Sequence, residues 1–120
     1  MSREWRAYRH DVIEYGGYVR EFVAGLTPDA FRADRRAQHA VLRDLEVVGE
    51  AVKRLPPEVL ARYPDIPWRR IMRFRDRLAH GYFDRDLAVG WDVVENHLPA
   101  LLTAAREILQ REDEQMSGEP

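Results

Sequence analysis

The sequence predicts an all-α protein, a single bundle of four main helices with one or two short ones. Apolar residues recur at spacings of three and four along most of the chain, which is the periodicity of helices with one buried face. Loop signals are few and short, and there is no repeat or long linker. The length of 120 residues suits one domain with one core.

The first helix is expected from about residue 5 to residue 23. Gly16 and Gly17 weaken it locally, by about 1 kcal/mol each relative to alanine, and could mark a close approach of another helix. Its apolar stripe consists of Trp5, Tyr8, Val12, Tyr15, Val19 and Phe22.

Prolines mark the boundaries of the expected helices in the next part of the chain. Thr27 and Pro28 predict an N-cap and a short helical turn that holds Phe31. A longer helix is expected over residues 34 to 55, and the two prolines at 56 and 57 stop it. One or two turns then lead into a rigid Tyr-Pro-Asp-Ile-Pro connector at residues 63 to 67. The apolar seam of the longer helix is Val41, Leu45, Val48, Val52 and Leu55.

Two further helices are expected after the connector. Pro67 opens the first of them, which buries Ile71, Phe74 and Leu78 and ends near Gly81. Asp84 or Asp86 is expected to cap the last helix. Its seam is the longest in the chain: Leu87, Trp91, Val94, Leu98, Leu101, Ala105 and Ile108.

Two features shape the end of the last helix. Pro99 removes the backbone bond to Glu95 and is expected to bend the helix. The seam ends at Leu109, so the helical domain is assigned to residues 1–110. Residues 111–120 carry one arginine and four acids and are expected to form an acidic, disordered tail.

Composition restricts the functional class. The chain has no cysteine, so disulfides and thiolate metal sites are excluded, and a reducing cytoplasm is expected. No apolar run suits a signal peptide or a membrane span. The net charge is only −2, but residues 62 to 85 hold seven arginines and three acids. This basic segment suits a polyanion such as RNA, although solvated helix faces are the commoner explanation.

Arg75, His80 and Tyr82 lie within eight residues beside a glycine and form the strongest functional signal. Histidine exchanges protons near neutral pH. Arginine can hold a phosphate oxygen as charge builds on it, and tyrosine offers a hydroxyl and a stacking face. We interpret Arg75 and His80 as catalytic residues of a ribonuclease that needs no metal and no cofactor.

In that reaction His80 takes the proton of a 2′-hydroxyl, the oxygen attacks the neighbouring phosphorus, and Arg75 stabilises the charged intermediate. A 2′,3′-cyclic phosphate is the expected product. One histidine cannot easily act as base and acid on opposite sides of one phosphorus, which favours a dimer. A structural role for His80, and simple packing for Tyr82, are the alternatives.

The remaining polar candidates are weaker. Arg73, Asp76 and Arg77 could contact RNA or phosphate, or could be solvated charges. The other histidines show no metal-ligand spacing and are expected to be structural or exposed; they are His10, His39 and His97.

The run from Ile66 to Phe83, followed by a helix with Trp91, resembles the HepT family of the HEPN superfamily. The family motif is arginine, four to six residues, histidine, any residue, tyrosine. Arg75, His80 and Tyr82 match it, and the resemblance extends to about residue 109. Asp76 stands where asparagine is more usual, and this acid could compete for Arg75 or change the ionisation of His80.

The resemblance implies a HEPN-type up-and-down bundle and a homodimeric toxin of a bacterial toxin-antitoxin pair that cuts RNA, often transfer RNA or messenger RNA. It also implies a neighbouring antitoxin, a minimal nucleotidyltransferase called MntA, that transfers AMP from ATP to the motif tyrosine, here Tyr82. The added charge and bulk would repel RNA from the site. The alternatives are a non-catalytic HEPN module that binds a nucleotide or the partner, and a plain helical dimerisation scaffold.

Overall fold

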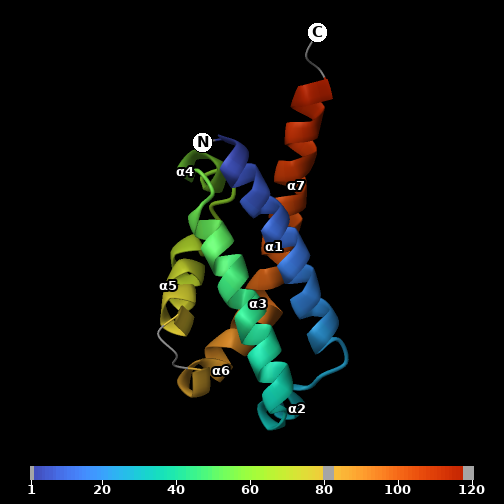
Figure 1. Cartoon of the computed structure of the whole chain (residues 1–120), viewed down its shortest axis with the longest axis vertical. Coiled ribbons are helices and arrows are strands. Elements are labelled where there is room, and N and C mark those ends of the chain that lie inside the picture. The colour runs from blue at the N-terminus through green and yellow to red at the C-terminus, as the bar shows by residue number, and fades with distance from the viewer. Residues whose placement is uncertain (1, 80–82, 118–120) are drawn as a thin grey trace.

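The computed structural model describes the backbone of residues 2–79 and 83–117, and the side chains of residues 5–78 and 87–111. The described backbone is helical with short connections and contains no strand, which confirms the predicted all-α class. The chain is elongated, 55 × 28 × 23 Å (Figure 1). The elements are α1 (Ser2–Val23), α2 (Pro28–Ala33), α3 (Arg35–Lys53), α4 (Pro57–Leu60), α5 (Trp68–Ala79), α6 (Phe83–Asp92), the π-helical turn η1 (Val93–His97) and α7 (Leu98–Ser117).

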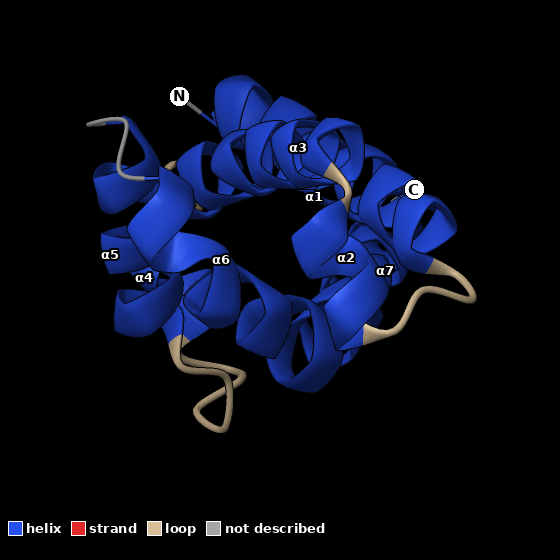
Figure 2. Cartoon of the chain, turned by 90° about the horizontal axis from the view of Figure 1, so that it is seen from below, coloured by secondary structure: helices blue, strands red, loops and turns tan. Residues whose placement is uncertain are grey.

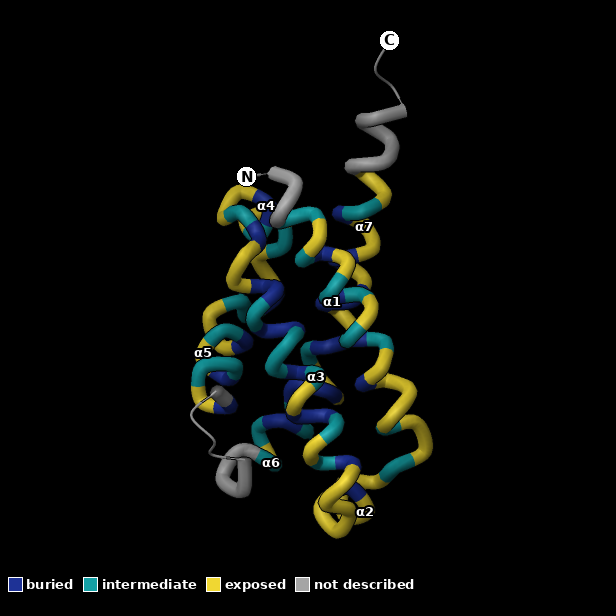
Figure 3. The backbone as a smooth tube through the Cα atoms, viewed as in Figure 1, coloured by how far each residue is buried: buried dark blue, intermediate teal, exposed yellow. Residues whose placement is uncertain are grey.

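Helix α3 is central to the bundle. It packs against α1 on one side and against α5 on the other, while α7 packs against α1. Seen along the long axis, the described chain consists of helices and loops (Figure 2). The backbone tube shows buried residues recurring along one side of each long helix (Figure 3). This is the pattern that spacings of three and four produce.

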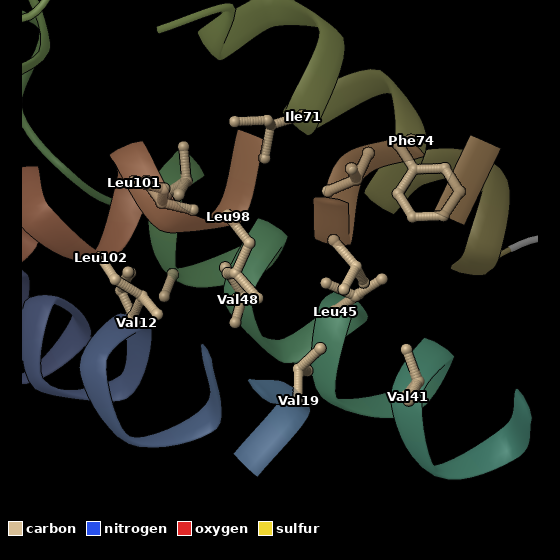
Figure 4. Packing of buried hydrophobic residues seen from close by; sticks show 14 of the residues in the cluster. Val12, Val19, Val41, Leu45, Val48, Ile71, Phe74, Leu98, Leu101 and Leu102 are labelled. Atoms are coloured by element: carbon tan, nitrogen blue, oxygen red, sulfur yellow. The ribbon is translucent and has the colours of Figure 1, made fainter. Parts of the chain in front are cut away.

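The buried core lies where these helices face one another (Figure 4). The predicted seams supply most of it, and the whole last-helix seam up to Ile108 is at least partly buried. Side chains from α1, α3, α5 and α7 meet in one cluster whose labelled members are Val12, Val19, Val41, Leu45, Val48, Ile71, Phe74, Leu98, Leu101 and Leu102.

Side-chain caps begin α2 and α3, and the cap at Thr27 was predicted. The Thr27 hydroxyl accepts the backbone N–H of Ala30 at 3.0 Å and caps α2. The Asp34 carboxylate accepts the N–H of Ala37 at 3.1 Å and caps α3. Both bonds satisfy amide groups that have no partner inside the helix. The residue at which α3 begins is therefore fixed by its own sequence.

The connector before α5 is held by the indole of Trp68. Its N–H donates to the carbonyl oxygens of Leu60 at 3.0 Å and Tyr63 at 3.1 Å. Ile66, inside the Tyr-Pro-Asp-Ile-Pro connector, is buried. The direction in which α5 leaves the connector is thereby tied to the turn formed by α4.

Gly16 and Gly17 of α1 differ in how closely another helix approaches them. A Cβ on Gly16 would lie 2.6 Å from the Cδ2 of Leu102, whereas Gly17 has no neighbouring atom within 4 Å of such a Cβ. The predicted close approach is therefore present at Gly16, where α7 crosses α1.

The last helix departs from the prediction at its start. Helix α6 already begins at Phe83, so the expectation that Asp84 or Asp86 is the N-cap is wrong. Both acids lie within the first turn of α6 instead. The backbone of α7 continues to Ser117, past residue 110. The assignment of residues 111–120 to a disordered tail stays a prediction.

The irregularity expected at Pro99 takes the form of η1, directly before α7. There the N–H of Leu98 donates to the carbonyl of Val93, five residues back instead of four. Pro99 has no N–H to continue the regular ladder. Among the described residues, no helix combines the length and the apolar character that a bilayer span requires.

Candidate active site around Arg75

Of the three motif residues, the structure describes Arg75. It lies in α5, seven residues into the helix that follows the Trp68-anchored connector. His80 and Tyr82 lie outside the described residues. Arg73 and Arg77 are exposed on α5, and Asp76 is half-buried beside Arg75. The structure thus gives the surroundings of the motif arginine, and the assigned roles of the motif residues stay predictions.

Two carboxylates hold the guanidinium of Arg75. Its Nη2 lies 2.9 Å from the Oε2 of Glu50 in α3, and its Nη1 lies 3.2 Å from the Oδ1 of Asp76. The Arg75 side chain is only 25 % exposed. Charge-assisted contacts of this kind are stronger than neutral hydrogen bonds and orient the guanidinium plane. Asp76 therefore contacts Arg75, as expected for an acid that competes for it.

The two carboxylates are themselves held by further cations of α3. The second oxygen of Glu50, Oε1, lies 3.2 Å from the Nη2 of Arg54. The Oδ1 of Asp76 also accepts a hydrogen bond of 2.9 Å from Lys53. We refer to these five residues, Glu50, Lys53, Arg54, Arg75 and Asp76, as the Arg75 network. Three cations and two carboxylates give it a formal charge of +1.

The network changes the ionisation of Asp76. The hydrogen bond from Lys53, followed by that from Arg75, holds the pKa of the Asp76 carboxyl below its usual value. Both donors favour the charged form, so the carboxylate persists at lower pH than in a free chain. Asp76 is accordingly a stable anion at any pH near neutrality.

Sequence reasoning found Arg75 and Asp76 but missed Glu50, Lys53 and Arg54. These three lie 21 to 25 residues before Arg75 at the end of α3, where Lys53 and Arg54 follow Glu50 at spacings of three and four. Such a pattern is typical of any solvated helix. Only the packing of α3 on α5 shows that they face the motif arginine. A glycine just before Glu50, at a position where helices cross, is the one signal that could have indicated it.

An open hollow of about 190 Å³ adjoins the network. Arg75 and Glu50 lie on its wall, and the ring of Tyr8 from α1 lies 5.9 Å below the guanidinium carbon of Arg54. The guanidinium of Arg75 is therefore reachable from solvent through this hollow. Its other lining residues are Asp11, Arg43, Glu46, Val47 and Ala51.

The other histidines lie apart from this site. His10 and His39 are exposed, and the Nε2 of the half-buried His97 lies 3.5 Å from the Oδ2 of Asp92. Within the described side chains, no three residues of the metal-ligand types cluster. Metal independence of the reaction stays a prediction, which cleavage in the presence of a chelator would test.

Comparison with known proteins shows which family this chain matches. The family described as HepT-like ribonucleases matches residues 12–108 of this chain. A protein of Methanocaldococcus jannaschii named as a candidate RNase is 38% identical over 109 residues, which are 91% of this chain and 90% of that protein. A protein of Thermococcus cleftensis named as a probable ribonuclease HepT is 38% identical over 101 residues, 84% of this chain and 92% of that protein. No solved structure gave a significant match.

Proposed function

Because the chain belongs to the HepT-like ribonuclease family, we propose that it is an endoribonuclease toxin that cuts RNA by 2′-hydroxyl attack without a metal. Membership of the family confirms the prediction of a ribonuclease. The reaction chemistry, the motif roles, the toxin role and the cytoplasmic site of action are our proposals.

One observation carries the chemical proposal: the match over residues 12–108 includes the whole Arg-x4-His-x-Tyr motif. The surroundings of Arg75 support it. The guanidinium lies at the wall of an open hollow, in a network with a formal charge of +1. An oriented, partly desolvated arginine is suited to the charge that builds on a phosphorane. The exposed Arg73 and Arg77 on the same helix could add contacts to the RNA backbone.

The proposed reaction breaks one P–O bond and forms another. His80 removes the proton of the 2′-hydroxyl, the 2′-oxygen attacks phosphorus, and the bond from phosphorus to the 5′-oxygen breaks. The departing 5′-oxygen takes a proton from an acid on the opposite side, for which a histidine of a second copy of the chain is suited. The products are a 2′,3′-cyclic phosphate and a 5′-hydroxyl. Arg75 binds the non-bridging oxygens throughout.

The test uses the purified full chain on a labelled RNA oligonucleotide with EDTA present. Cleavage with 2′,3′-cyclic phosphate ends is expected, together with its loss in His80→Ala and Arg75→Ala. A single 2′-deoxy substitution at the cleaved position is expected to block the cut there, because it removes the nucleophile. RNA binding without cleavage by the unmodified protein would instead support the non-catalytic binding module.

We further propose that Tyr82 is the control point and that an MntA-like nucleotidyltransferase adds AMP to it. Each AMP adds negative charge two residues from His80, which opposes RNA binding. The intact mass of the chain expressed with and without such a partner tests this. A gain in multiples of one AMP unit that maps to Tyr82 is expected. An unchanged mass with active partner and ATP would contradict the modification and favour inhibition by binding.

A further inference from the structure

We propose that Glu50 is a positioning residue that holds the Arg75 guanidinium in the orientation that receives the RNA phosphate. This inference rests on the proposed function, since it concerns the motif arginine. It assigns a role to a residue of α3 that lies 25 positions before the motif. Three observations carry it: the contacts of Arg75, the way Glu50 is itself held, and the charge of the network.

The contacts of Arg75 with the described residues use only part of its donor set. A guanidinium has five N–H groups. Nη1 donates to Asp76 at 3.2 Å, and Nη2 forms an ion pair with Glu50 at 2.9 Å. The Nε atom is buried and makes no hydrogen bond within the described part of the chain. Each terminal nitrogen carries two N–H groups and contacts one carboxylate among the described residues, so each keeps one donor that a bidentate contact to two phosphate oxygens could use.

Glu50 is better placed than Asp76 to fix this orientation. It reaches Arg75 from a different helix, so it sets the guanidinium relative to α3 and not only to α5. Its two oxygens are divided between Arg75 and Arg54, which fixes the carboxylate from both sides. Asp76 is more exposed, 50 % against 31 %, and shares its Oδ1 between Arg75 and Lys53.

Removal of Glu50 would have two opposite effects, one on the charge of the network and one on the orientation of Arg75. Glu50 lowers the charge of the network, so its removal would raise the formal charge from +1 to +2 and strengthen the attraction for phosphate. A freely rotating Arg75 would, however, meet the transition state less often in the right geometry. Loss of Glu50 should therefore lower kcat and leave KM equal or lower. Lost charge alone does not lower kcat, and a loss of folded protein, which lowers the apparent kcat at unchanged KM, is excluded by normalising the rate to the folded fraction measured by circular dichroism.

The experiment measures kcat and KM of the full chain on the labelled RNA oligonucleotide. For Glu50→Gln we expect kcat to fall roughly 10- to 100-fold without a rise in KM. Glu50→Asp keeps the charge and should recover part of the loss. Arg54→Met, at an exposed position, removes the group that holds Oε1 and should lower kcat by a smaller factor. These two variants keep the proposal testable if Glu50→Gln folds poorly.

Glu46→Gln is the matched control. Glu46 lies one turn earlier on α3, lines the same hollow and pairs with Arg43 at 3.4 Å, not with Arg75. Its substitution removes the same charge from the same hollow. Any fall in KM that comes from charge alone should therefore appear in this variant too, without the large loss of kcat.

Other results would overturn the inference. An unchanged or raised kcat in Glu50→Gln, with Arg75→Ala inactive, would mean that Glu50 does not position Arg75. Equal losses of kcat in Glu50→Gln and Glu46→Gln would also contradict it. If the wild type does not cleave, or if Arg75→Ala is fully active, the proposed function fails, and the positioning role fails with it. The Arg75→Ala control therefore separates the two failures.

Discussion

Gly49 and Arg75 touch across the contact between α3 and α5. A Cβ built on Gly49 would lie 2.4 Å from the Cβ of Arg75, 2.8 Å from its Cγ and 3.5 Å from its Cα. A change of rotamer moves the Cγ but not the Cα or the Cβ, so it cannot relieve the 2.4 Å contact. The missing side chain of Gly49 is thus what allows α5 to come close enough for Arg75 to meet Glu50, the next residue of α3.

Gly49→Ala is therefore expected to destabilise the protein and to separate Arg75 from Glu50. Overpacking costs about 1–3 kcal/mol, and the gain in helix propensity returns up to about 1 kcal/mol. We expect a net loss of about 1–2 kcal/mol in the free energy of unfolding, measured by urea denaturation. The RNA-cleavage rate should fall as well, since the contact between the two helices that carries the network is forced apart.

Gly17→Ala is the control for the effect of replacing a helical glycine by alanine without a close neighbour. Gly17 is helical in α1, and a Cβ there would meet no atom within 4 Å. This variant should gain about 0.5–1 kcal/mol from helix propensity and cleave RNA at the wild-type rate. Equal stability changes in the two variants would show that the contact of Gly49 with Arg75 is not tight in solution.

A second prediction concerns the pKa of Asp76. The hydrogen bond from Lys53 is the larger cause of its low pKa, and that from Arg75 the smaller. Lys53→Met should therefore raise this pKa toward the usual value of 3.8, as followed by an NMR titration of the carboxyl carbon. Arg54→Met removes a neighbouring cation that contacts Glu50 instead, and should change the pKa less.

The lowered pKa of Asp76 determines how the stability of the fold depends on pH. A carboxyl with a lower pKa in the folded state stabilises the protein above its unfolded pKa, and that contribution disappears as the pH falls through the folded pKa. Wild type and Lys53→Met should thus differ most at neutral pH and converge under strong acid. A difference that grows as the pH falls would contradict the ion pair between Lys53 and Asp76.

The helices were predictable because each carries its own signals. The seam at Leu45 and Val48, the caps at Thr27 and Asp34, and the proline at 99 act within a few residues of the chain. Packing between helices was not predictable in the same way. Nothing in the local sequence of α3 says that Glu50 faces α5, because an exposed acid and an acid paired across helices produce the same local pattern.

Asp44 illustrates the same limit and leads to a third prediction. It lies on α3 among other charged residues and would be taken as solvated, yet partial burial raises its pKa, and Arg43 only partly opposes the shift. A carboxyl with a raised folded-state pKa destabilises the fold once it is ionised. Asp44→Asn should therefore raise the melting temperature at pH 7. This gain in melting temperature should vanish at low pH, where Asp44 is protonated in both the folded and the unfolded state. A lower melting temperature of Asp44→Asn at pH 7 would contradict the prediction.

The last prediction concerns Asp76 and the affinity for RNA. Asp76→Asn keeps a side chain of the same shape, whose amide oxygen can still accept from Lys53 or Arg75, but it raises the formal charge of the Arg75 network from +1 to +2. A unit charge about 4 Å from a phosphate is worth about 1 kcal/mol when fully solvated, so the affinity should rise about fivefold or less. Fluorescence anisotropy in a His80→Ala background measures this without cleavage.

Asp65→Asn makes the same change of charge in the exposed connector, outside the Arg75 network. Because interactions between exposed charges are screened over about 8 Å at physiological salt, it should raise the affinity less than Asp76→Asn does. The advantage of Asp76→Asn should also shrink as salt is added, since it is electrostatic. Equal effects of the two variants would mean that the RNA responds only to the overall charge of the basic segment. An effect confined to Asp76 would place the phosphate at Arg75.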